Sequence, residues 1–293
     1  MKTAFVFPGQ GSQFVGMGND FAESLLDQAN AILGFDLKKI CFEGPEEELK
    51  KTEITQPAIL TVSVAAFDKL QIRLRRTNIQ LQTVAGHSLG EYSALVAAGA
   101  IRFEDAVKIV HLRGKFMQEA VPLGVGAMAA ILGGERNKIN EICQEVGNVW
   151  PANYNSPEQI VISGQKESVE KAGEKIKAAG AKRVIPLAVS APFHCPLMQP
   201  AADKLSMELE KIEIKNAQIA VVANVTADYV TKGEAIRALL IKQVTSPVLW
   251  EDSIKKMIAD GVTQFIEAGP GKVLSGLIKS IDKSVAVKTY QEV

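Results

Sequence analysis

The sequence has few cysteines and no excess of charge of either sign. Its three cysteines, Cys41, Cys143 and Cys195, are an odd number and form no C-x-x-C pair, which argues against a disulfide framework and against a zinc site. The 33 basic residues are balanced by 33 acidic ones, which argues against nucleic acid as a bulk partner. We therefore expect reduced thiols, no metal and no nucleic acid.

Long apolar segments are also missing. No apolar run approaches the roughly 20 residues that a membrane-spanning helix needs, and the segment before Pro8 is too short for the apolar region of a signal peptide. We expect no membrane partner and a cytoplasmic location. The 293 residues are 47% hydrophobic, which is enough to fill the core of one two-part unit or of two small domains.

The pentapeptide G-H-S-L-G at 86–90 lies between a strand-like run at 81–85 and a helix-like run at 91–98. Glycines two residues before and after Ser88 let the strand and the helix approach closely, and they leave Oγ exposed near the positive end of the helix. This pattern is typical of a nucleophile elbow, which poises a serine for acyl transfer. A plain glycine-rich loop is the alternative.

A second glycine-bounded loop, P-G-Q-G-S-Q at 8–13, follows an apolar strand at 4–7. Because active groups collect at the carboxyl ends of parallel strands, this loop can present backbone N–H groups to the serine loop. A phosphate-cradling loop and a plain turn are the alternatives. The sequence lacks both the Lys-Ser/Thr ending of a Walker loop and the G-x-G-x-x-G motif, which counts against phosphate binding.

Strand-like and helix-like segments alternate up to about residue 120, which predicts a parallel α/β layer with helices at 56–70, 91–98 and 104–120. The order then changes to a ferredoxin-like βαββαβ unit, with strands at 127–132, 149–154, 159–163 and 183–188 and helices at 135–146 and 168–179. Strands at 221–225 and 264–266 return to the first domain. We expect a large domain of residues 1–122 and 191–293, interrupted by a small one of 123–190.

Five motifs then occur in a fixed order: F-P-G-Q-G-S-Q at 7–13, T-Q-P-A at 55–58, G-H-S-L-G-E-Y at 86–92, S-A-P-F-H-C-P-L-M at 190–198 and E-A-G-P-G at 267–271. Through them nearly the whole chain resembles the malonyl-coenzyme A:acyl-carrier-protein transacylases. The resemblance implies a hydrolase-like parallel α/β/α domain with an inserted ferredoxin-like subdomain and an active site in the gorge between them. It also implies malonyl-CoA as the substrate, CoA as the product, acyl carrier protein as the partner and no bound cofactor.

Acyl transfer by a serine requires a general base, and the sequence has three histidines. His87 adjoins the nucleophile, where successive side chains diverge, so orientation of the loop is its favoured task. His111 lies inside the predicted helix 104–120, where a packed or solvent-facing histidine is the favoured interpretation. His194 remains, in a proline-bracketed loop after the last strand of the small domain. The matching motif at 190–198 favours catalysis there over a structural role.

Arg113 interrupts the apolar face of the helix predicted at 104–120. That face comprises Ala106, Ile109, Val110, Arg113, Phe116, Met117 and Ala120. A cation in this position requires a partner, and snorkelling to water or a structural ion pair are the plain interpretations. The resemblance instead implies that Arg113 holds the free carboxylate of the malonyl group, a contact that suits the planar guanidinium fork.

The resemblance implies further site residues. The backbone N–H groups of Gln10 and Leu89 would bind the oxyanion, and the carbonyl of Gln243 would orient His194, since no acidic motif stands near that histidine. His87 and Asn153 are additional candidates for substrate binding. The implied reaction is ping-pong transfer through a malonyl-Ser88 intermediate, which supplies extender units for fatty-acid synthesis.

Alternative functions remain open at this point. Phe193, before the histidine, is typical of many malonyl-selective polyketide acyltransferases, so a free-standing, trans-acting malonyltransferase of a polyketide assembly line is one alternative. A serine esterase shares the elbow but would not need Arg113 and usually carries an acidic triad member. A noncatalytic module that docks carrier proteins is a third.

Basic clusters are the sequence's candidates for the surface that docks acidic carrier proteins. They are Arg73, Arg75 and Arg76, or Lys182 with Arg183, and ordinary solvated charges are the plain interpretation.

Overall fold

Two β-sheets organise the chain in the computed structural model, which describes residues 2–74, 80–189 and 191–293. The larger sheet has the strand order β10-β9-β1-β2-β7-β8. Its strands are β1 (Lys2–Phe7), β2 (Gln80–Gly86), β7 (Ala220–Ala223), β8 (Asp228–Val230), β9 (Gln264–Glu267) and β10 (Ala286–Thr289). Neighbouring strands are parallel except for β7 and β8, so the carboxyl ends of β1, β2, β7 and β9 meet at one edge of the sheet.

Both faces of this sheet are buried, as the alternation of side chains along β1 shows. Phe5 and Phe7 belong to one apolar core, and Ala4 and Val6 belong to another on the opposite face. Strands that are buried on both faces are typically continuous apolar runs, and β1 fits this pattern because Ala4 to Phe7 are apolar and buried.

Helices cover the two faces. The elements are α1 (Glu23–Leu33), α2 (Leu37–Glu43), α3 (Glu46–Leu49), α4 (Thr52–Leu74), α5 (Leu89–Ala97), α6 (Phe103–Glu119), α9 (Gln199–Leu209), α10 (Gly233–Gln243), α11 (Trp250–Ala259) and α12 (Val273–Ile281). Side chains of α4, α5, α6, α9 and α10 fill the core beside Phe5, and those of α11 and α12 fill the other. In the described part of the chain, no helix combines the length and the apolarity that a membrane crossing requires.

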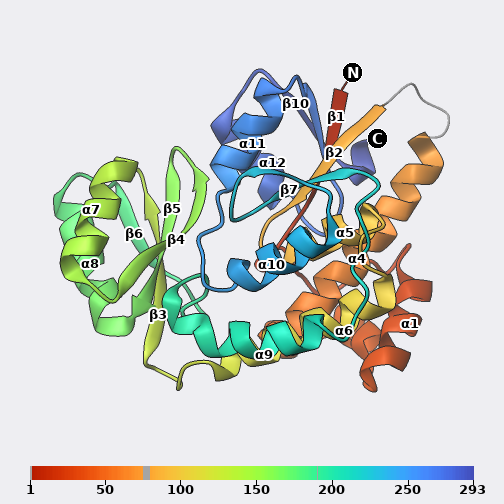
Figure 1. The fold of residues 1–293 in the computed structure, drawn as a ribbon, viewed down its shortest axis with the longest axis horizontal. Helices are drawn as coiled ribbons and strands as arrows, with labels where there is room; N and C mark the ends of the chain where they lie inside the picture. The colour runs from red at the N-terminus through yellow and green to blue at the C-terminus, as the bar shows by residue number, and fades with distance from the viewer. Residues whose placement is uncertain (1, 75–79, 190) are drawn as a thin grey trace.

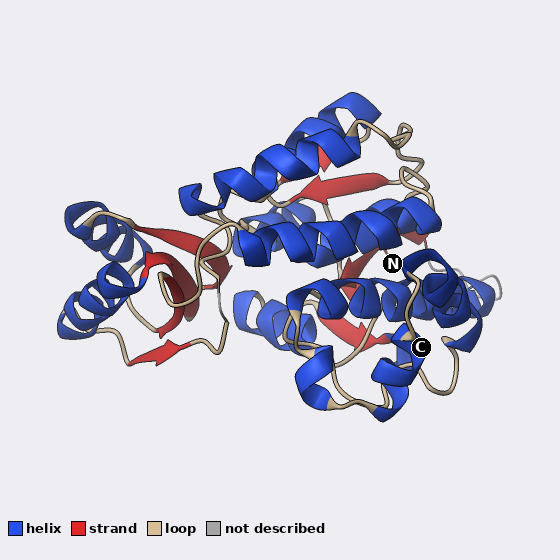
Figure 2. Cartoon of the chain, turned by 90° about the horizontal axis from the view of Figure 1, so that it is seen from below, coloured by secondary structure: helices blue, strands red, loops and turns tan. Residues whose placement is uncertain are grey.

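The smaller sheet forms a separate lobe beside the larger one in both views of the molecule (Figures 1 and 2). It is built from β3 (Gly126–Leu132), α7 (Arg136–Val146), β4 (Val149–Ser156), β5 (Gln159–Gln165), α8 (Lys166–Ala178) and β6 (Arg183–Pro186). Its strand order is β4-β5-β3-β6 and all pairs are antiparallel. This arrangement confirms the ferredoxin-like prediction.

The predicted fold class is therefore confirmed: a parallel α/β domain carries an antiparallel subdomain. The exact domain boundaries at 122/123 and 190/191 stay a prediction. The sequence patterns missed the edge strands β8 and β10, which are three and four residues long, and they placed the last small-domain strand two residues too far, because β6 ends at Pro186.

The prediction for α4 was wrong at its start. The helix begins at Thr52 and continues through Pro57, although the proline ring removes an N–H that would bond the carbonyl of Glu53. His111 Nδ1 donates to that carbonyl at 2.8 Å instead. The histidine therefore has a packed, structural role, one of the two that were favoured for it, and α4 begins four residues before its predicted start.

Candidate active site

The serine loop joins β2 to α5 in a strained turn. Ser88 has φ 51° and ψ −105°, a backbone conformation that L residues rarely adopt. A Cβ on Gly86 would lie 1.9 Å from the carbonyl of Gly90, and one on Gly90 would lie 2.0 Å from Phe7 O. Both glycines are thus required by close backbone approach, as the nucleophile elbow predicts.

The first loop packs directly on this elbow. His87 N donates to Phe7 O at 3.0 Å, and a Cβ on Gly9 would lie 2.4 Å from His87 O. Gln10 follows at once and lines the same cavity as Ser88. The structure therefore brings the two glycine-bounded loops together at the carboxyl ends of β1 and β2.

Ser88 and His194 form the reacting pair of side chains. Ser88 Oγ lies 2.7 Å from His194 Nε2, and His194 Nδ1 lies 2.9 Å from the carbonyl oxygen of Gln243. Because a carbonyl only accepts, Nδ1 carries the proton and Nε2 is left to accept from the serine hydroxyl. Burial and the nearby Arg113 cation lower the pKa of His194 to about 3, so the imidazole is neutral and able to act as a base.

Arg113 comes from α6 and is almost completely buried, with 1% of its surface exposed. Among the described residues, its Nη1 donates to Gln56 Oε1 at 2.8 Å, and its Nη2 donates to Gln243 Oε1 at 2.9 Å and to Ser88 Oγ at 3.1 Å. All three acceptors are neutral. The guanidinium is held 5.5 Å from the Tyr92 ring. A buried cation whose hydrogen-bond partners carry no charge is a site for an anion.

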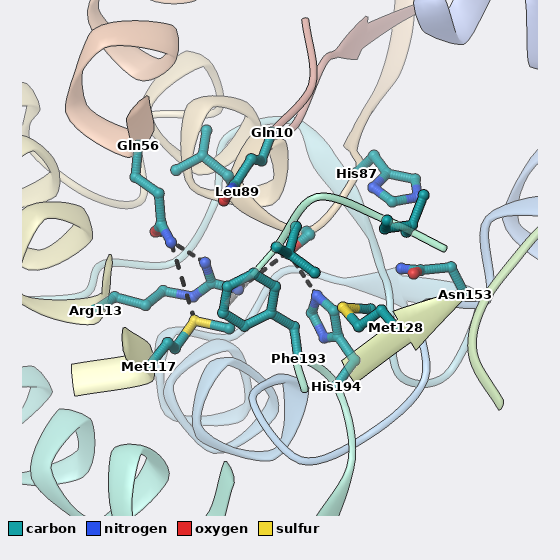
Figure 3. A pocket seen from close by; sticks show the side chains of 13 residues that line it. Gln10, Gln56, His87, Leu89, Arg113, Met117, Met128, Asn153, Phe193 and His194 are labelled. Atoms are coloured by element: carbon teal, nitrogen blue, oxygen red, sulfur yellow. Dashed lines mark hydrogen bonds between the residues drawn. The ribbon is translucent and has the colours of Figure 1, made fainter. Parts of the chain in front are cut away.

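His87 and Asn153 lie on the side of the cavity toward the small lobe (Figure 3). His87 Nε2 donates to Asn155 Oδ1 at 2.8 Å, and its ring centroid lies 5.7 Å from that of Trp250. Burial lowers the pKa of His87. Asn153, on β4, lines the cavity and is 6% exposed. His87 is thus directed away from Ser88 Oγ, and its loop-orienting role stays a prediction, as does substrate binding by either residue.

The cavity brings nearly all predicted site residues together. Figure 3 shows Gln56 and Arg113 on one wall and His194, Met128 and Asn153 on another. The lining residues are Gln10, Gln56, His87, Ser88, Leu89, Arg113, Met117, Met128, Asn153, Leu187, Val189, Phe193 and His194. Gln243 reaches the site through its carbonyl and its side-chain amide. Leu89 is the first residue of α5, where an N–H has no acceptor inside the helix.

Sequence reasoning assigned no role to Gln56, Glu91 or Asn224. Gln56 and Glu91 stand in the quoted motifs T-Q-P-A and G-H-S-L-G-E-Y, so a signal was present. Asn224 directly follows the buried strand β7 at the sheet edge where active groups collect, and its Oδ1 accepts from Ser88 N at 2.7 Å. That contact was missed, because Asn224 lies in none of the five motifs and is 136 residues away from Ser88 in the sequence.

Other candidate sites gave a mixed outcome. Within the described ranges, no group of three or more His, Cys, Asp or Glu side chains is placed to hold a metal ion. Arg73 donates to Val293 O at 2.9 Å, while Arg75 and Arg76 lie outside the described residues. Lys182 forms an ion pair with Glu158 at 3.0 Å. The carrier-docking surface therefore stays a prediction.

Comparison with known proteins matches residues 4–291 to the family model described as the acyl transferase domain. The chain is 51% identical to the malonyl CoA-acyl carrier protein transacylase of Escherichia coli strain K12 over 298 residues, which covers 99% of this chain and 96% of the relative. It is 52% identical to the protein of the same name from Bacillus subtilis strain 168, with 98% and 93% covered.

Solved structures give the same result. The crystal structure of an acyl carrier protein S-malonyltransferase from Vibrio cholerae superposes with a TM-score of 0.95 at 47% identity, covering 99% of this chain and 96% of that one. A malonyl-transacylase in complex with a type II polyketide acyl-carrier protein superposes with a TM-score of 0.93 at 48% identity, with 99% and 95% covered. These relatives are similar over the full architecture, including both lobes.

Proposed function

The chain belongs to the acyl transferase family, and we propose that it moves a malonyl group from malonyl-CoA to the phosphopantetheine thiol of acyl carrier protein through an ester on Ser88. The observation that carries the proposal is the short contact between Ser88 Oγ and His194 Nε2, 2.7 Å, beside a buried arginine whose hydrogen-bond acceptors in the described part of the chain are all neutral. The first element supports acyl transfer, and the second supports an acyl group that ends in a carboxylate.

In the first half-reaction, Ser88 Oγ attacks the thioester carbon of malonyl-CoA and passes its proton to His194 Nε2. The oxyanion forms opposite the backbone N–H groups of Gln10 and Leu89. Collapse breaks the carbon–sulfur bond, and the CoA sulfur takes the proton from His194 as it leaves. The product is a malonyl ester of Ser88.

The second half-reaction reverses these roles with a new thiol. The phosphopantetheine sulfhydryl of the carrier protein gives its proton to His194 Nε2 and attacks the ester carbon. The bond between Ser88 Oγ and the acyl carbon breaks, and Oγ recovers the proton. The Gln243 carbonyl keeps the imidazole in the tautomer that both halves require, because it accepts from Nδ1 at 2.9 Å.

Arg113 selects the acyl group in this proposal. Its fork already faces Ser88 Oγ at 3.1 Å, so a short acyl chain on the serine brings its far end against the guanidinium. A malonyl carboxylate would supply the charge that the amides of Gln56 and Gln243 do not, in the bidentate geometry that arginine favours.

An esterase and a noncatalytic docking module are less well supported. An esterase usually orients its histidine with a carboxylate, whereas a backbone carbonyl does so here. It also has no use for a buried cation beside the acyl group. A docking module would not need the strained serine or its contact with a neutral histidine. The pathway is proposed to be fatty-acid synthesis, in the cytoplasm, where the free, buried cysteines stay reduced.

A polyketide assembly line is the second candidate, because one similar structure is a complex with a polyketide carrier protein. Transfer rates to purified carrier proteins of the two pathways would separate the candidates. A higher kcat/KM for the fatty-acid carrier supports the first, and the reverse order supports the second.

The covalent step tests the function directly. Intact-mass measurement after mixing with malonyl-CoA should show one malonyl adduct, located on Ser88 and absent in Ser88→Ala, with transfer reduced by up to about 10⁶-fold. Addition of a carrier protein that bears phosphopantetheine should remove the adduct and malonylate the carrier. An adduct that persists in Ser88→Ala would refute the assignment, and loss of the adduct to water at the same rate without carrier would indicate an esterase.

A further inference from the structure

Glu91 is a buried acid in the first turn of α5 that the two half-reactions do not use. It is 2% exposed, and its Oε2 accepts from Gln243 Nε2 at 2.8 Å and from Asn224 N at 3.0 Å. Burial of a carboxylate away from water costs free energy unless hydrogen bonds or a nearby cation stabilise its charge. Both donors to Glu91 belong to residues that contact the reacting groups.

Gln243 connects Glu91 to the base and to the cation. Its side-chain Nε2 donates to Glu91, its Oε1 accepts from Arg113 Nη2 at 2.9 Å, and its backbone carbonyl accepts from His194 Nδ1. The carboxylate therefore helps to fix which way this amide points, because only Nε2 can donate to it. The carbonyl oxygen of Ser88, which accepts from the same Nε2 at 3.1 Å, favours the same orientation. With the opposite orientation, the amide would turn its NH₂ group toward the guanidinium, and the contact with Arg113 would be lost.

Asn224 connects Glu91 to the strained elbow. Its backbone N–H donates to Glu91, its Oδ1 accepts from Ser88 N at 2.7 Å, and its Nδ2 donates to Gly86 O at 2.7 Å. Ser88 holds a positive φ of 51°, which persists only where the surroundings impose it. One carboxylate oxygen thus accepts from the side chain of Gln243 and from the backbone of Asn224, and other atoms of these two residues contact Ser88, His194 and Arg113.

We propose that Glu91 is a positioning residue for acyl transfer: its carboxylate orients Gln243 and anchors Asn224, and so holds His194, Arg113 and Ser88 in their reactive arrangement. The inference rests on the proposed function, because it concerns the same transfer reaction. It assigns Glu91 no contact with the substrate. The effect requires the charged form, since a charge-assisted hydrogen bond is about twice as strong as a neutral one.

Protonation of Glu91 offers a way to observe this role. Burial raises its pKa to about 7, although Asn224, Gln243 and Arg113 favour the charged form. Two of the titratable groups near it titrate far from neutrality: burial lowers the pKa of His194 to about 3, and burial raises the pKa of Tyr92 to about 12. Burial also moves the pKa of His87 below its ordinary range.

The test compares Ser88 acylation in wild type and in Glu91→Gln across pH, by rapid quench and intact mass. Malonyl-pantetheine is the donor, because it lacks the titrating phosphate of CoA. Glutamine resembles the protonated acid in shape and charge, so the wild type should be faster by about 10-fold at pH 8.5, and the ratio should approach one at pH 5.5. A ratio that stays constant over this range overturns the proposal, because a merely structural role does not follow the charge.

Glu267→Gln is the matched control. Glu267 is also a fully buried acid, but it accepts from Leu274 N and from Ser275 N and Oγ, outside the network around Ser88. Its acylation rate per folded molecule should equal that of the wild type at every pH. If the ratio of the wild-type rate to the Glu267→Gln rate also changed with pH, protonation of a buried acid outside the site would be enough to alter acylation, and the proposal would be overturned.

A double-mutant cycle with Gln243→Met tests the route of the effect. This variant keeps the carbonyl that faces His194 and removes the side-chain amide, so Glu91→Gln should cost less in its background than in the wild type. Full additivity overturns the proposed route. If Glu91→Gln does not fold, the wild type alone is decisive: its acylation rate should rise through about pH 7, and a flat profile refutes the proposal. Absence of any wild-type adduct would instead refute the proposed function.

Discussion

Arg113→Ala should separate malonyl from acetyl transfer. Arg113 is 1% exposed, and its acceptors among the described residues, Gln56, Gln243 and Ser88, are neutral, so a malonyl carboxylate would add an anion in direct contact with the guanidinium. Removal of one member of a buried ion pair costs about 3 to 5 kcal/mol, which lowers kcat/KM for malonyl-CoA by about 10² to 10³ or more. Acetyl-CoA has no carboxylate and should be transferred equally well or better, because alanine removes an unpaired cation from beside its methyl group.

The quantity to measure is the ratio of kcat/KM for malonyl-CoA to kcat/KM for acetyl-CoA. Arg113 also donates to Ser88 Oγ and Gln243 Oε1, and any effect of losing those bonds applies to both substrates alike, so it cancels in the ratio. Steady-state transfer of both acyl groups to one carrier protein gives the ratio directly. Arg113→Lys should restore it poorly, because an ammonium lacks the bidentate fork.

Arg136→Ala is a control of the same residue type. Its guanidinium lies 3.8 Å from the Tyr154 ring centroid and bonds Asp252 at 2.9 and 2.8 Å, outside the cavity. The malonyl-to-acetyl ratio should stay unchanged in that variant. If Arg113→Ala slows both acyl groups equally, Arg113 is structural and the specificity argument is wrong.

Two further predictions concern the elbow and its base. Gly90→Ala places a Cβ 2.0 Å from Phe7 O, so thermal unfolding should show a free energy of unfolding lower by about 1 to 3 kcal/mol or more, and acylation should be slow. In the control Gly276→Ala the added Cβ meets nothing within 4 Å, so stability and acylation should not change. Equal melting temperatures for the two variants would contradict the steric argument. Because burial lowers the pKa of His194 to about 3 from 6.5, only the unfolded state takes up this proton as the pH falls below 6.5. The stability of the wild type relative to His194→Ala should then fall by about 1.4 kcal/mol per pH unit between about pH 6 and pH 4, measured by urea unfolding, and a constant difference would show that the imidazole is not buried neutral.

Local patterns predicted the parts of the fold that depend on local geometry. The paired glycines of the elbow, the order of the small lobe and the buried face of α6 each follow from spacing along one or two elements, and the structure has all three. The start of α4 did not follow, because a proline inside a helix disfavours the turn before it, and the partner that bonds the freed carbonyl here is distant in the sequence. His111, 58 positions further along, does so.

The candidate site shows the same limit. Ser88, His194 and Arg113 stand out as residue types that carry chemistry in unusual surroundings. Asn224 and the side chain of Gln243 do not, since an amide on a helix or after a strand is ordinary until its partners are known. Gln243 contacts Ser88 across 155 positions of sequence. Such contacts exist only after the sheet edge has assembled, so the residues that position the site are less predictable than those that react.

The choice of partners for Arg113 explains how one site can hold a cation and still bind an anion. A carboxylate in direct contact would neutralise the guanidinium and compete with a malonyl group for the same fork. The amides of Gln56 and Gln243 orient the fork at 2.8 and 2.9 Å without neutralising it. Glu91 accepts from Nε2 of the same Gln243 amide whose Oε1 accepts from Arg113, so the neutral amide lies between the carboxylate and the guanidinium. The negative charge of Glu91 therefore stabilises the buried cation without direct contact, and the face of the arginine toward Ser88 is left for the substrate.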